Sequence, residues 1–186
     1  MELIGFEKVK NGKYLKNYEL TYLNKAGRIK KYEIVSRREL NGPEELGLRP
    51  SGISIIALWE NKLLLLREFR MGVNRTIYNL CAGMLEEGET PEECIRRELY
   101  EETGLSLKRI QIILPPSYAA VAISDVSTSI AIVEAEGYIS SGHTSDNEEI
   151  SAAFYSKEEV EELLREGAPF SSRAQIAAYF FTKGLV

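Results

Sequence analysis

The spacing of apolar positions predicts a series of strands in the second part of the chain. Residues 53–59 and 62–69 are almost continuously apolar and are separated by the turn Glu60-Asn61, a pattern typical of strands buried on both faces. Further strands are expected at 107–114, 128–136 and 150–155. Because helices are interspersed with these strands, the fold class is expected to be α/β, with helices packed on a mixed sheet.

Helices are expected where side chains can cap a first turn. Thr90-Pro91-Glu92-Glu93 offers a capping threonine, a proline at the first helical position and a glutamate that completes a capping box. Gly104 supplies a stop signal, so the sequence predicts a helix over 91–103. A second capping box, Ser156-Lys157-Glu158-Glu159, predicts a helix to about residue 166, and Ser172-Arg173-Ala174-Gln175 begins a last helix that runs toward 182.

The first 48 residues are polar, rich in tyrosine and only weakly patterned. Segments 14–23 and 28–35 alternate loosely around Asn24-Lys25-Ala26-Gly27, which predicts a hairpin. Breaker clusters follow at 41–43 and 49–52. The domain organisation is therefore expected to be a small N-terminal antiparallel β module over 1–48, followed by the main domain over 49–186.

Composition narrows the class of protein. The chain has 186 residues, 44% of them apolar and 27% charged, close to an ordinary globular protein. Its formal net charge is −5 without a dominant basic cluster, so no nucleic-acid partner is expected. The chain has two cysteines, and its start shows no basic segment followed by an apolar one. It also has no apolar run long enough to span a bilayer. We therefore expect a cytoplasmic location and no membrane partner.

Carboxylates on the helix expected at 91–103 carry the candidate chemistry. Glu98, Glu101 and Glu102 are spaced at i, i+3 and i+4, so they share one face beside the apolar positions of the same helix. A partly buried group of carboxylates is costly without a cation, and Mg²⁺ prefers such oxygen ligands. A solvated acidic face is the alternative reading of the triplet alone.

The residues around this triplet decide between the two readings. The full pattern is Gly83-x5-Glu89-x7-Arg97-Glu98-Leu99-x-Glu101-Glu102-x-Gly104-Leu105, and its chance occurrence is on the order of one in a billion per starting position. The pattern resembles the Nudix box at every fixed position. The resemblance implies an α/β/α sandwich that binds Mg²⁺ or Mn²⁺ and hydrolyses nucleoside diphosphates linked to another moiety.

The resemblance also implies roles for individual residues. Glu98 and Glu102 would be the principal metal ligands, with Glu101 a further ligand or one that acts through water, and the backbone carbonyl of Ala82 would join them. Arg97 would orient the carboxylates. Glu89 would hold the loop before the helix, and Gly83 would let the backbone approach the metal and phosphate closely.

Outside the box, the chain resembles the ADP-ribose pyrophosphatase branch of the family and its nucleotide-sugar relatives. In that branch the N-terminal β module is exchanged within a homodimer and its aromatics help to hold the base, which makes Tyr18 and Tyr32 candidates for base contacts. Cross-strand packing is the alternative role of these rings. Arg67 and especially Arg70 are candidates for phosphate binding, against a reading as exposed strand-end arginines.

A late acidic loop and two departures complete the comparison with the branch. Glu148 or Glu149 matches the late glutamate that often serves as base or extra ligand in this branch. The alternative interpretation is an ordinary charged loop exposed to solvent. The branch usually has Glu-x-Pro-Ala-Gly where this chain has Asn79-Leu80-Cys81-Ala82-Gly83. Its Ser-Pro-Gly-x-Ser/Thr-Asp-Glu loop is replaced by Ala120-Val121-Ala122-Ile123-Ser124-Asp125-Val126.

Three functions remain open on these grounds. The first is metal-dependent hydrolysis of ADP-ribose to AMP and ribose 5-phosphate. The second is the same chemistry on another nucleotide sugar or a dinucleotide. The third is a Nudix-like domain that binds a nucleotide as a sensor, although the intact box carboxylates favour an enzyme.

Overall fold

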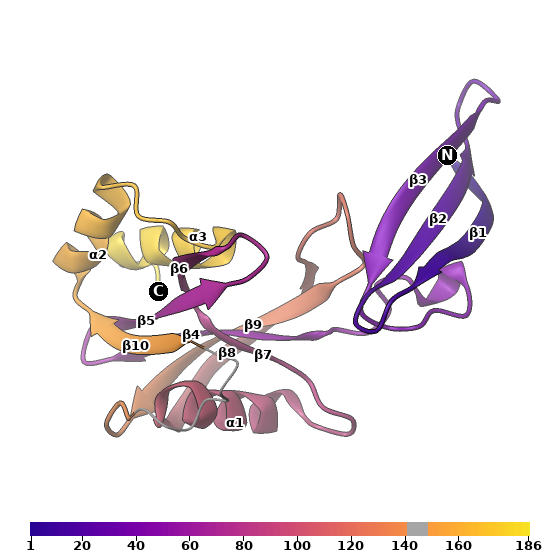
Figure 1. Ribbon diagram of the computed structural model, residues 1–186. Coiled ribbons are helices and arrows are strands. Elements are labelled where there is room, and N and C mark those ends of the chain that lie inside the picture. The colour runs from indigo at the N-terminus through magenta and orange to yellow at the C-terminus, as the bar shows by residue number, and fades with distance from the viewer. Residues whose placement is uncertain (141–148) are drawn as a thin grey trace. The chain divides into compact units, whose positions relative to one another are not determined.

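The computed structural model describes residues 1–140 and 149–186, and the chain forms two compact units (Figure 1). The small unit consists of Met1–Ser51 and Pro116–Thr128, and the main unit of Gly52–Pro115 and Ser129–Val186. The segment 116–128 therefore belongs to the small unit, whereas the sequence had assigned it to the main domain. No helix in the described part of the chain is long and apolar enough to cross a membrane.

An antiparallel sheet forms the body of the small unit. Its strands are β1 (Glu2–Asn11), β2 (Lys16–Leu23) and β3 (Ile29–Ser36), in the order β1-β2-β3, with a short 3-10 helix at Pro43–Glu45. The predicted hairpin is thus confirmed as β2 and β3. Strand β1 was not predicted, because most of its residues are exposed and the segment has no clear apolar pattern. A small core lies on one side of the sheet and includes Tyr18, Leu20, Ile34 and Leu40.

A seven-stranded sheet runs through the main unit in the order β10-β5-β4-β9-β8, with β6 paired to β5 and β7 paired to β4. Its strands are β4 (Gly52–Trp59), β5 (Lys62–Arg70), β6 (Arg75–Asn79), β7 (Cys81–Met84), β8 (Ser106–Tyr118), β9 (Ser127–Glu136) and β10 (Ile150–Tyr155). The five longer strands confirm the sequence prediction. The short strands β6 and β7 were missed, since neither has a clear apolar pattern of its own.

Helices cover both faces of this sheet (Figure 1). Helix α1 (Pro91–Thr103) packs Cys94, Ile95 and Leu99 into one core, and α2 (Lys157–Arg165) and α3 (Ser172–Thr182) pack into the other. The pleat of the strands explains the two cores: Leu64 and Leu66 of β5 belong to the α1 side, and the alternate residues of that strand to the α2 and α3 side. The expected α/β/α sandwich is therefore confirmed.

Strand β8 extends beyond its predicted end at residue 114 to Tyr118 and passes through Pro115 and Pro116. Proline lacks a backbone N–H and is confined largely to edge strands. Strand β8 is the last strand in the order of its sheet, so its free side tolerates both residues.

Candidate functional site

Helix α1 begins and ends where its sequence predicts. Thr90 accepts a hydrogen bond from the Glu93 N–H, and the Glu93 carboxylate accepts from the Thr90 N–H in return, which forms the predicted capping box. Gly104 ends the helix in the left-handed region, with φ 75°. Local signals at both ends therefore fix the bounds of α1, and its apolar residues Cys94, Ile95 and Leu99 turn one side toward the sheet.

The carboxylates of α1 differ in their exposure. Glu98 is buried, with 8% of its surface exposed, and Glu102 is partly buried, whereas the Glu101 side chain is 50% exposed. The Glu98 carboxylate lies directly against Gly83 of β7, since a Cβ added to that glycine would lie 1.6 Å from Glu98 Oε1. Gly83 thus provides the space that Glu98 occupies, while its predicted approach to metal and phosphate stays a prediction.

Strand β7 also holds Glu102. The Ala82 N–H donates to Glu102 Oε2 at 3.1 Å, and the buried Cys81 thiol lies beside the same carboxylate. Burial raises the pKa of Glu102 to about 8, and burial also raises the pKa of Glu98. These two carboxylates are therefore ionised at neutral pH only at a cost that a cation would remove.

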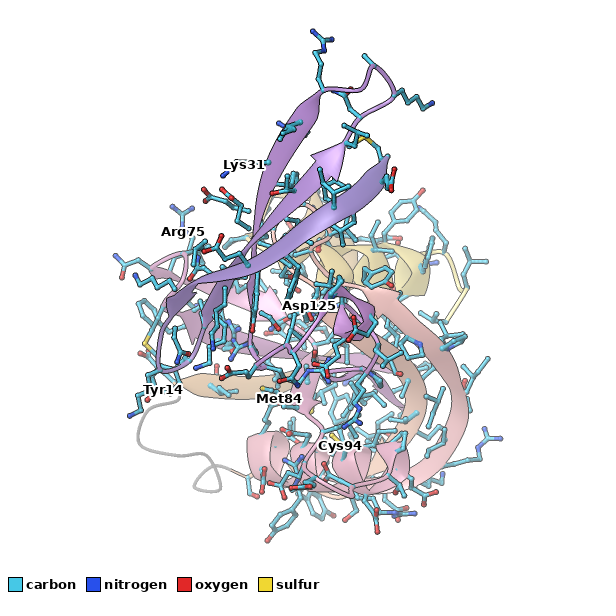
Figure 2. All side chains as sticks on the ribbon, turned by 90° about the vertical axis from the view of Figure 1, so that its right-hand side faces the viewer. Tyr14, Lys31, Arg75, Met84, Cys94 and Asp125 are labelled. Carbon is cyan, nitrogen blue, oxygen red and sulfur yellow. The ribbon has the colours of Figure 1, made fainter. Side chains whose placement is uncertain are left out.

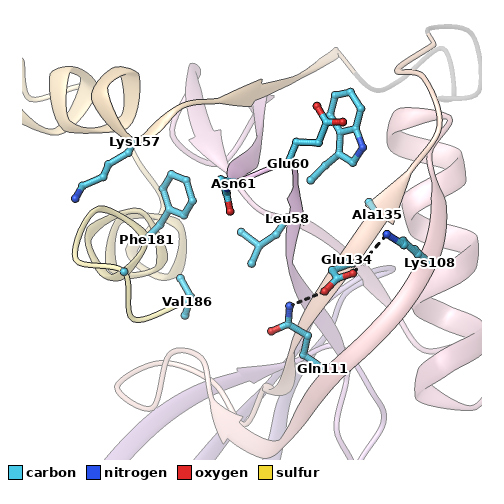
Figure 3. Close-up of a pocket in the computed structure, with 12 residues that line it drawn as sticks. Leu58, Glu60, Asn61, Lys108, Gln111, Glu134, Ala135, Lys157, Phe181 and Val186 are labelled. Atoms are coloured by element: carbon cyan, nitrogen blue, oxygen red, sulfur yellow. Dashed lines mark hydrogen bonds and ion pairs between the residues drawn. The ribbon is translucent and has the colours of Figure 1, made fainter.

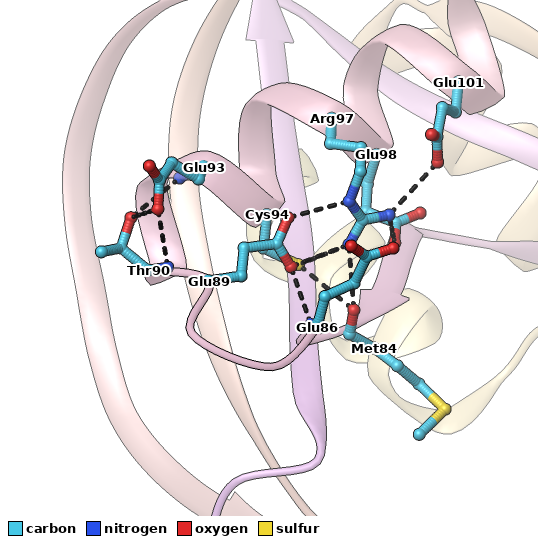
Figure 4. Close-up of polar contacts among 9 residues, drawn as sticks. All are labelled: Met84, Glu86, Glu89, Thr90, Glu93, Cys94, Arg97, Glu98 and Glu101. Carbon is cyan, nitrogen blue, oxygen red and sulfur yellow. Dashed lines mark hydrogen bonds and ion pairs between the residues drawn. The ribbon is translucent and has the colours of Figure 1, made fainter.

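Arg97 is the centre of the polar contacts around α1 (Figure 4). Its guanidinium makes a two-point contact with Glu89, with Nε–Oε1 2.8 Å and Nη2–Oε2 2.9 Å. It also donates to Glu98 at 2.6 Å and to Glu101 at 3.2 Å. The hydrogen bonds from Arg97 to Glu89 lower the pKa of Glu89 to about 2. Arg97 thus ties the loop before α1 to the carboxylates on its face, as the sequence predicts.

The chemistry of the site fits a divalent cation. The carboxylate oxygens of Glu98 and Glu102 are desolvated, and divalent cations such as Mg²⁺ prefer oxygen ligands. Only a glycine at residue 83 leaves room for Glu98 to lie this close to β7. The Glu101 side chain is half exposed, and no group of three His, Cys, Asp or Glu side chains is gathered for a metal among the described residues. A metal site here would therefore rest on Glu98 and Glu102, with substrate oxygens and water as further ligands.

The end of β5 brings a further carboxylate and an arginine to the same face. Glu68 forms an ion pair with Arg70, and its charge contributes to the raised pKa of Glu102, so it lies near the α1 carboxylates. Asn79 of β6 donates to Glu68 at 2.8 Å, and Ser171 donates to Asn79 at 2.7 Å. Glu68 was not predicted as a site residue. Its position between the two candidate arginines was the only signal.

Arg67 does not share this face. Side chains alternate along a strand, so Arg67 projects with Leu63 and Leu65 toward the α2 and α3 side, where it influences Tyr155. Glu68 and Arg70 project toward α1 instead. Arg70 is therefore the arginine of β5 that accompanies the carboxylates, and a substrate contact by Arg67 stays a prediction.

The tyrosines of the small unit divide into packed and accessible rings. Tyr18 is 0% exposed, stacks on Phe6 and accepts from the Leu40 N–H at 2.7 Å, so its predicted base contact is corrected to a core role. Tyr32 is 39% exposed and donates to the Ala122 carbonyl at 2.6 Å. It lines a cavity of about 220 Å³ within the small unit. Tyr14 is 71% exposed in the turn after β1 (Figure 2).

The late acidic loop is described only in part. Glu148 lies outside the described residues. Glu149 is exposed and directly precedes β10, and its backbone carbonyl accepts from the Phe69 N–H at 3.0 Å. Its backbone is therefore located at the end of β5 that carries Glu68 and Arg70.

A larger cavity of the main unit lies apart from these residues (Figure 3). It has a volume of about 600 Å³ and lies beside α3, with Leu58, Phe181 and Val186 among its apolar lining residues. Lys108 and Gln111 contact Glu134 at its edge. None of the residues predicted for the site lines this cavity, so the chemistry on α1 and the larger cavity are separate features.

Comparisons with known proteins agree with this arrangement. Residues 48–178 match the sequence model of the NUDIX domain. ADP-ribose pyrophosphatase of Bacillus subtilis (strain 168) is 32% identical over 108 residues, which cover 58% of this chain and 52% of the relative. ADP-sugar pyrophosphatase of Mus musculus is 29% identical over 103 residues, which cover 53% of this chain and 45% of the relative. The chain thus spans about half the length of these relatives.

A solved structure extends the likeness to the whole fold. The crystal structure of an ADP compounds hydrolase superposes with a TM-score of 0.71 at 18% identity, covering 99% of this chain and 96% of that one. At this identity the likeness concerns the fold. The match to the domain model over residues 48–178, which is more than half of the chain, shows that the chain belongs to the Nudix (NUDIX domain) family.

Proposed function

We propose that this protein is a Mg²⁺- or Mn²⁺-dependent hydrolase that cleaves the pyrophosphate bond of a nucleoside diphosphate linked to another moiety. The desolvated pair Glu98 and Glu102, held by Arg97 and β7, carries this proposal. ADP-ribose is the substrate favoured by the relatives' names, with AMP and ribose 5-phosphate as products.

The chain's own residues would hold the ion and the substrate in fixed geometry. Glu98 and Glu102 would ligate the cation, with Glu101 acting through water and the Ala82 carbonyl as a further ligand. A bound divalent cation supplies charge neutralisation of the diphosphate and a more acidic water. Arg97 fixes the carboxylates, so that the ligands are in place before the substrate arrives. Phosphoryl transfer depends mainly on such positioning and charge stabilisation.

Individual residues remain candidates for contacts with the substrate. Arg70 suits a phosphate oxygen, since its guanidinium offers a planar array of donors. Tyr32 remains our candidate for the base, in the small cavity that Tyr22 and Tyr118 also line and where Asp125 offers a carboxylate. Glu149, together with Glu148, remains the candidate general base.

We also propose that the protein acts as a homodimer. Apolar side chains are exposed on the three-stranded sheet, with Ile4 50%, Val9 53% and Ile29 67% exposed. These side chains are candidates for burial between two copies of the chain. Analytical ultracentrifugation measures the mass in solution, and a monomer at all concentrations would contradict this part of the proposal.

A panel of diphosphate compounds tests the activity. ADP-ribose, several nucleotide sugars, dinucleotides and nucleoside triphosphates are incubated with Mg²⁺, with Mn²⁺ or with EDTA, and the products are quantified. We expect cleavage of ADP-ribose to AMP and ribose 5-phosphate only with metal, and we expect the isosteric variant Glu102→Gln to lose most of that activity. Glu162→Gln on α2, which removes an exposed ion pair to Arg165, is the matched control.

The altered loop at 120–126 motivates two other outcomes of this panel. Cleavage of another nucleotide sugar or of a dinucleotide alone would keep the chemistry and change the substrate. Tight binding of one compound without cleavage of any would favour a nucleotide sensor and refute the hydrolase.

A further inference from the structure

A chain of three hydrogen-bonded side chains ends on Arg70. Ser171 Oγ donates to Asn79 Oδ1 at 2.7 Å, Asn79 Nδ2 donates to Glu68 Oε2 at 2.8 Å, and Glu68 Oε1 accepts from Arg70. The members come from three elements: the residue that caps α3, strand β6 and strand β5. The contact between Ser171 and Asn79 joins residues far apart in sequence, whereas Glu68 and Arg70 lie on the same strand.

The direction of every hydrogen bond in this chain is determined. A carboxylate can only accept, so Asn79 must turn its amide N–H groups toward Glu68. That orientation leaves the Asn79 carbonyl facing Ser171, whose hydroxyl must donate. Each donor in this series therefore faces an acceptor. Replacing one donor by an acceptor, or the reverse, leaves two like groups facing each other.

A buried carboxylate such as Glu68 destabilises the folded protein unless its oxygen atoms accept hydrogen bonds. Glu68 is 8% exposed, whereas 53% of the Arg70 side chain remains exposed. The buried carboxylate thus anchors one side of the guanidinium and leaves other donors of Arg70 open toward solvent and ligand. Arg173 in the first turn of α3 lies close enough for the charge of Arg70 to contribute, after burial, to a lowered pKa of Arg173.

We propose that Glu68, Asn79 and Ser171 position the Arg70 guanidinium for the diphosphate of the substrate. This inference rests on the proposed function, in which Arg70 contacts a phosphate oxygen. It also accounts for the departure at residue 79: the carboxylate expected at that position stands at residue 68 on the adjacent strand, and Asn79 supplies the amide that holds it. Glu68 and Asn79 are positioning residues that act through Arg70.

We call the hydrogen-bonded series Ser171, Asn79, Glu68 and Arg70 the relay. A double-mutant cycle with isosteric changes tests whether it positions Arg70. Glu68→Gln alone sets an amide N–H against a donor of Asn79 or Arg70, and Asn79→Asp alone sets two carboxylates together. In the double variant Glu68→Gln/Asn79→Asp, Ser171 donates to Asp, Gln donates to the same Asp, and the Gln carbonyl accepts from Arg70. Every hydrogen bond is then satisfied again with the charge moved to the other strand.

The readouts are KM and kcat on the compound that the wild type cleaves, and calorimetric affinity for an uncleavable methylene-bridged analogue of the diphosphate. We expect each single variant to raise KM and weaken analogue binding about tenfold, with kcat changed less, as for a hydrogen bond to a charged group. The double variant should return to within about threefold of the wild type. Glu162→Gln should match the wild type in both assays.

Other outcomes would contradict the positioning role, the hydrolase activity or both. Additive losses in the double variant, or single variants equal to an active wild type, would refute the relay while leaving the hydrolase intact. A wild type that binds the analogue but cleaves nothing would refute the hydrolase, and the binding cycle would still test the relay. A wild type that neither cleaves nor binds would refute both. If Asn79→Asp fails to fold, Glu68→Gln against the double variant measures the same rescue.

Discussion

Gly83 shows how one missing side chain can shape an active site. A Cβ at this position would lie 1.6 Å from Glu98 Oε1, so Gly83→Ala must displace the carboxylate, while the end of a flexible side chain can move without unfolding the protein. We expect kcat/KM to fall about a hundredfold, the loss typical of a displaced catalytic group, with little change in melting temperature. Gly72→Ala is the control, because nothing lies within 4 Å of a Cβ there. Equal activity of the two variants would contradict the steric role.

Glu102 makes the stability of the metal-free protein depend on pH. Burial raises its pKa from 4.5 to about 8, so between these values the folded protein binds a proton that the unfolded chain has released. Stability must then fall as pH rises through this window. We expect the melting temperature in EDTA to decline across it in the wild type more steeply than in Glu102→Gln, which has no proton to lose. Parallel profiles in scanning calorimetry would rule out this titration.

At the scale of elements, Arg97 joins the loop before α1 to the helix itself. Its two-point contact with Glu89 requires a planar guanidinium, which lysine cannot reproduce. We therefore expect Arg97→Lys to lower kcat/KM by about tenfold or more, through lost charge-assisted hydrogen bonds. Arg96→Lys on the same helix is the control, since its partner Glu92 is exposed. The assignment would fail if both variants retained wild-type kinetics.

Elements differ in how far sequence predicts them. The bounds of α1 follow from Thr90, Glu93 and Gly104, whose capping contacts lie within a few residues of one another, and the structure has the same bounds. The relay through Glu68 could not be foreseen, because it depends on the register of β5 against β6. That register sets which side chains face α1, and no local pattern specifies it. Arg67 and Arg70 lie three residues apart on one strand, so the pleat of β5 places them on opposite faces.

At the scale of the molecule, the division of the chain was only partly predictable. The breaker clusters near residues 41–52 mark where the first segment of the small unit ends, at Ser51. Its second segment, Pro116–Thr128, returns from far along the chain. The Val35 N–H donates to the Ile123 carbonyl at 2.8 Å, a contact between strand β3 and that segment which no sequence pattern announces. Tertiary contacts therefore decide which segments make up a unit.

Binding of a metal should stabilise the folded chain by mass action. A cation that binds only the folded state adds about 2.7 kcal/mol to the free energy of unfolding at one hundred times its dissociation constant. Because the proposed site removes the cost of two desolvated carboxylates, we expect the melting temperature to rise with Mg²⁺ or Mn²⁺ concentration. The double variant Glu98→Gln/Glu102→Gln should melt at a temperature that does not depend on either metal. A similar metal-dependent rise in that variant would locate the ion elsewhere, since glutamine offers no charge to hold it at α1.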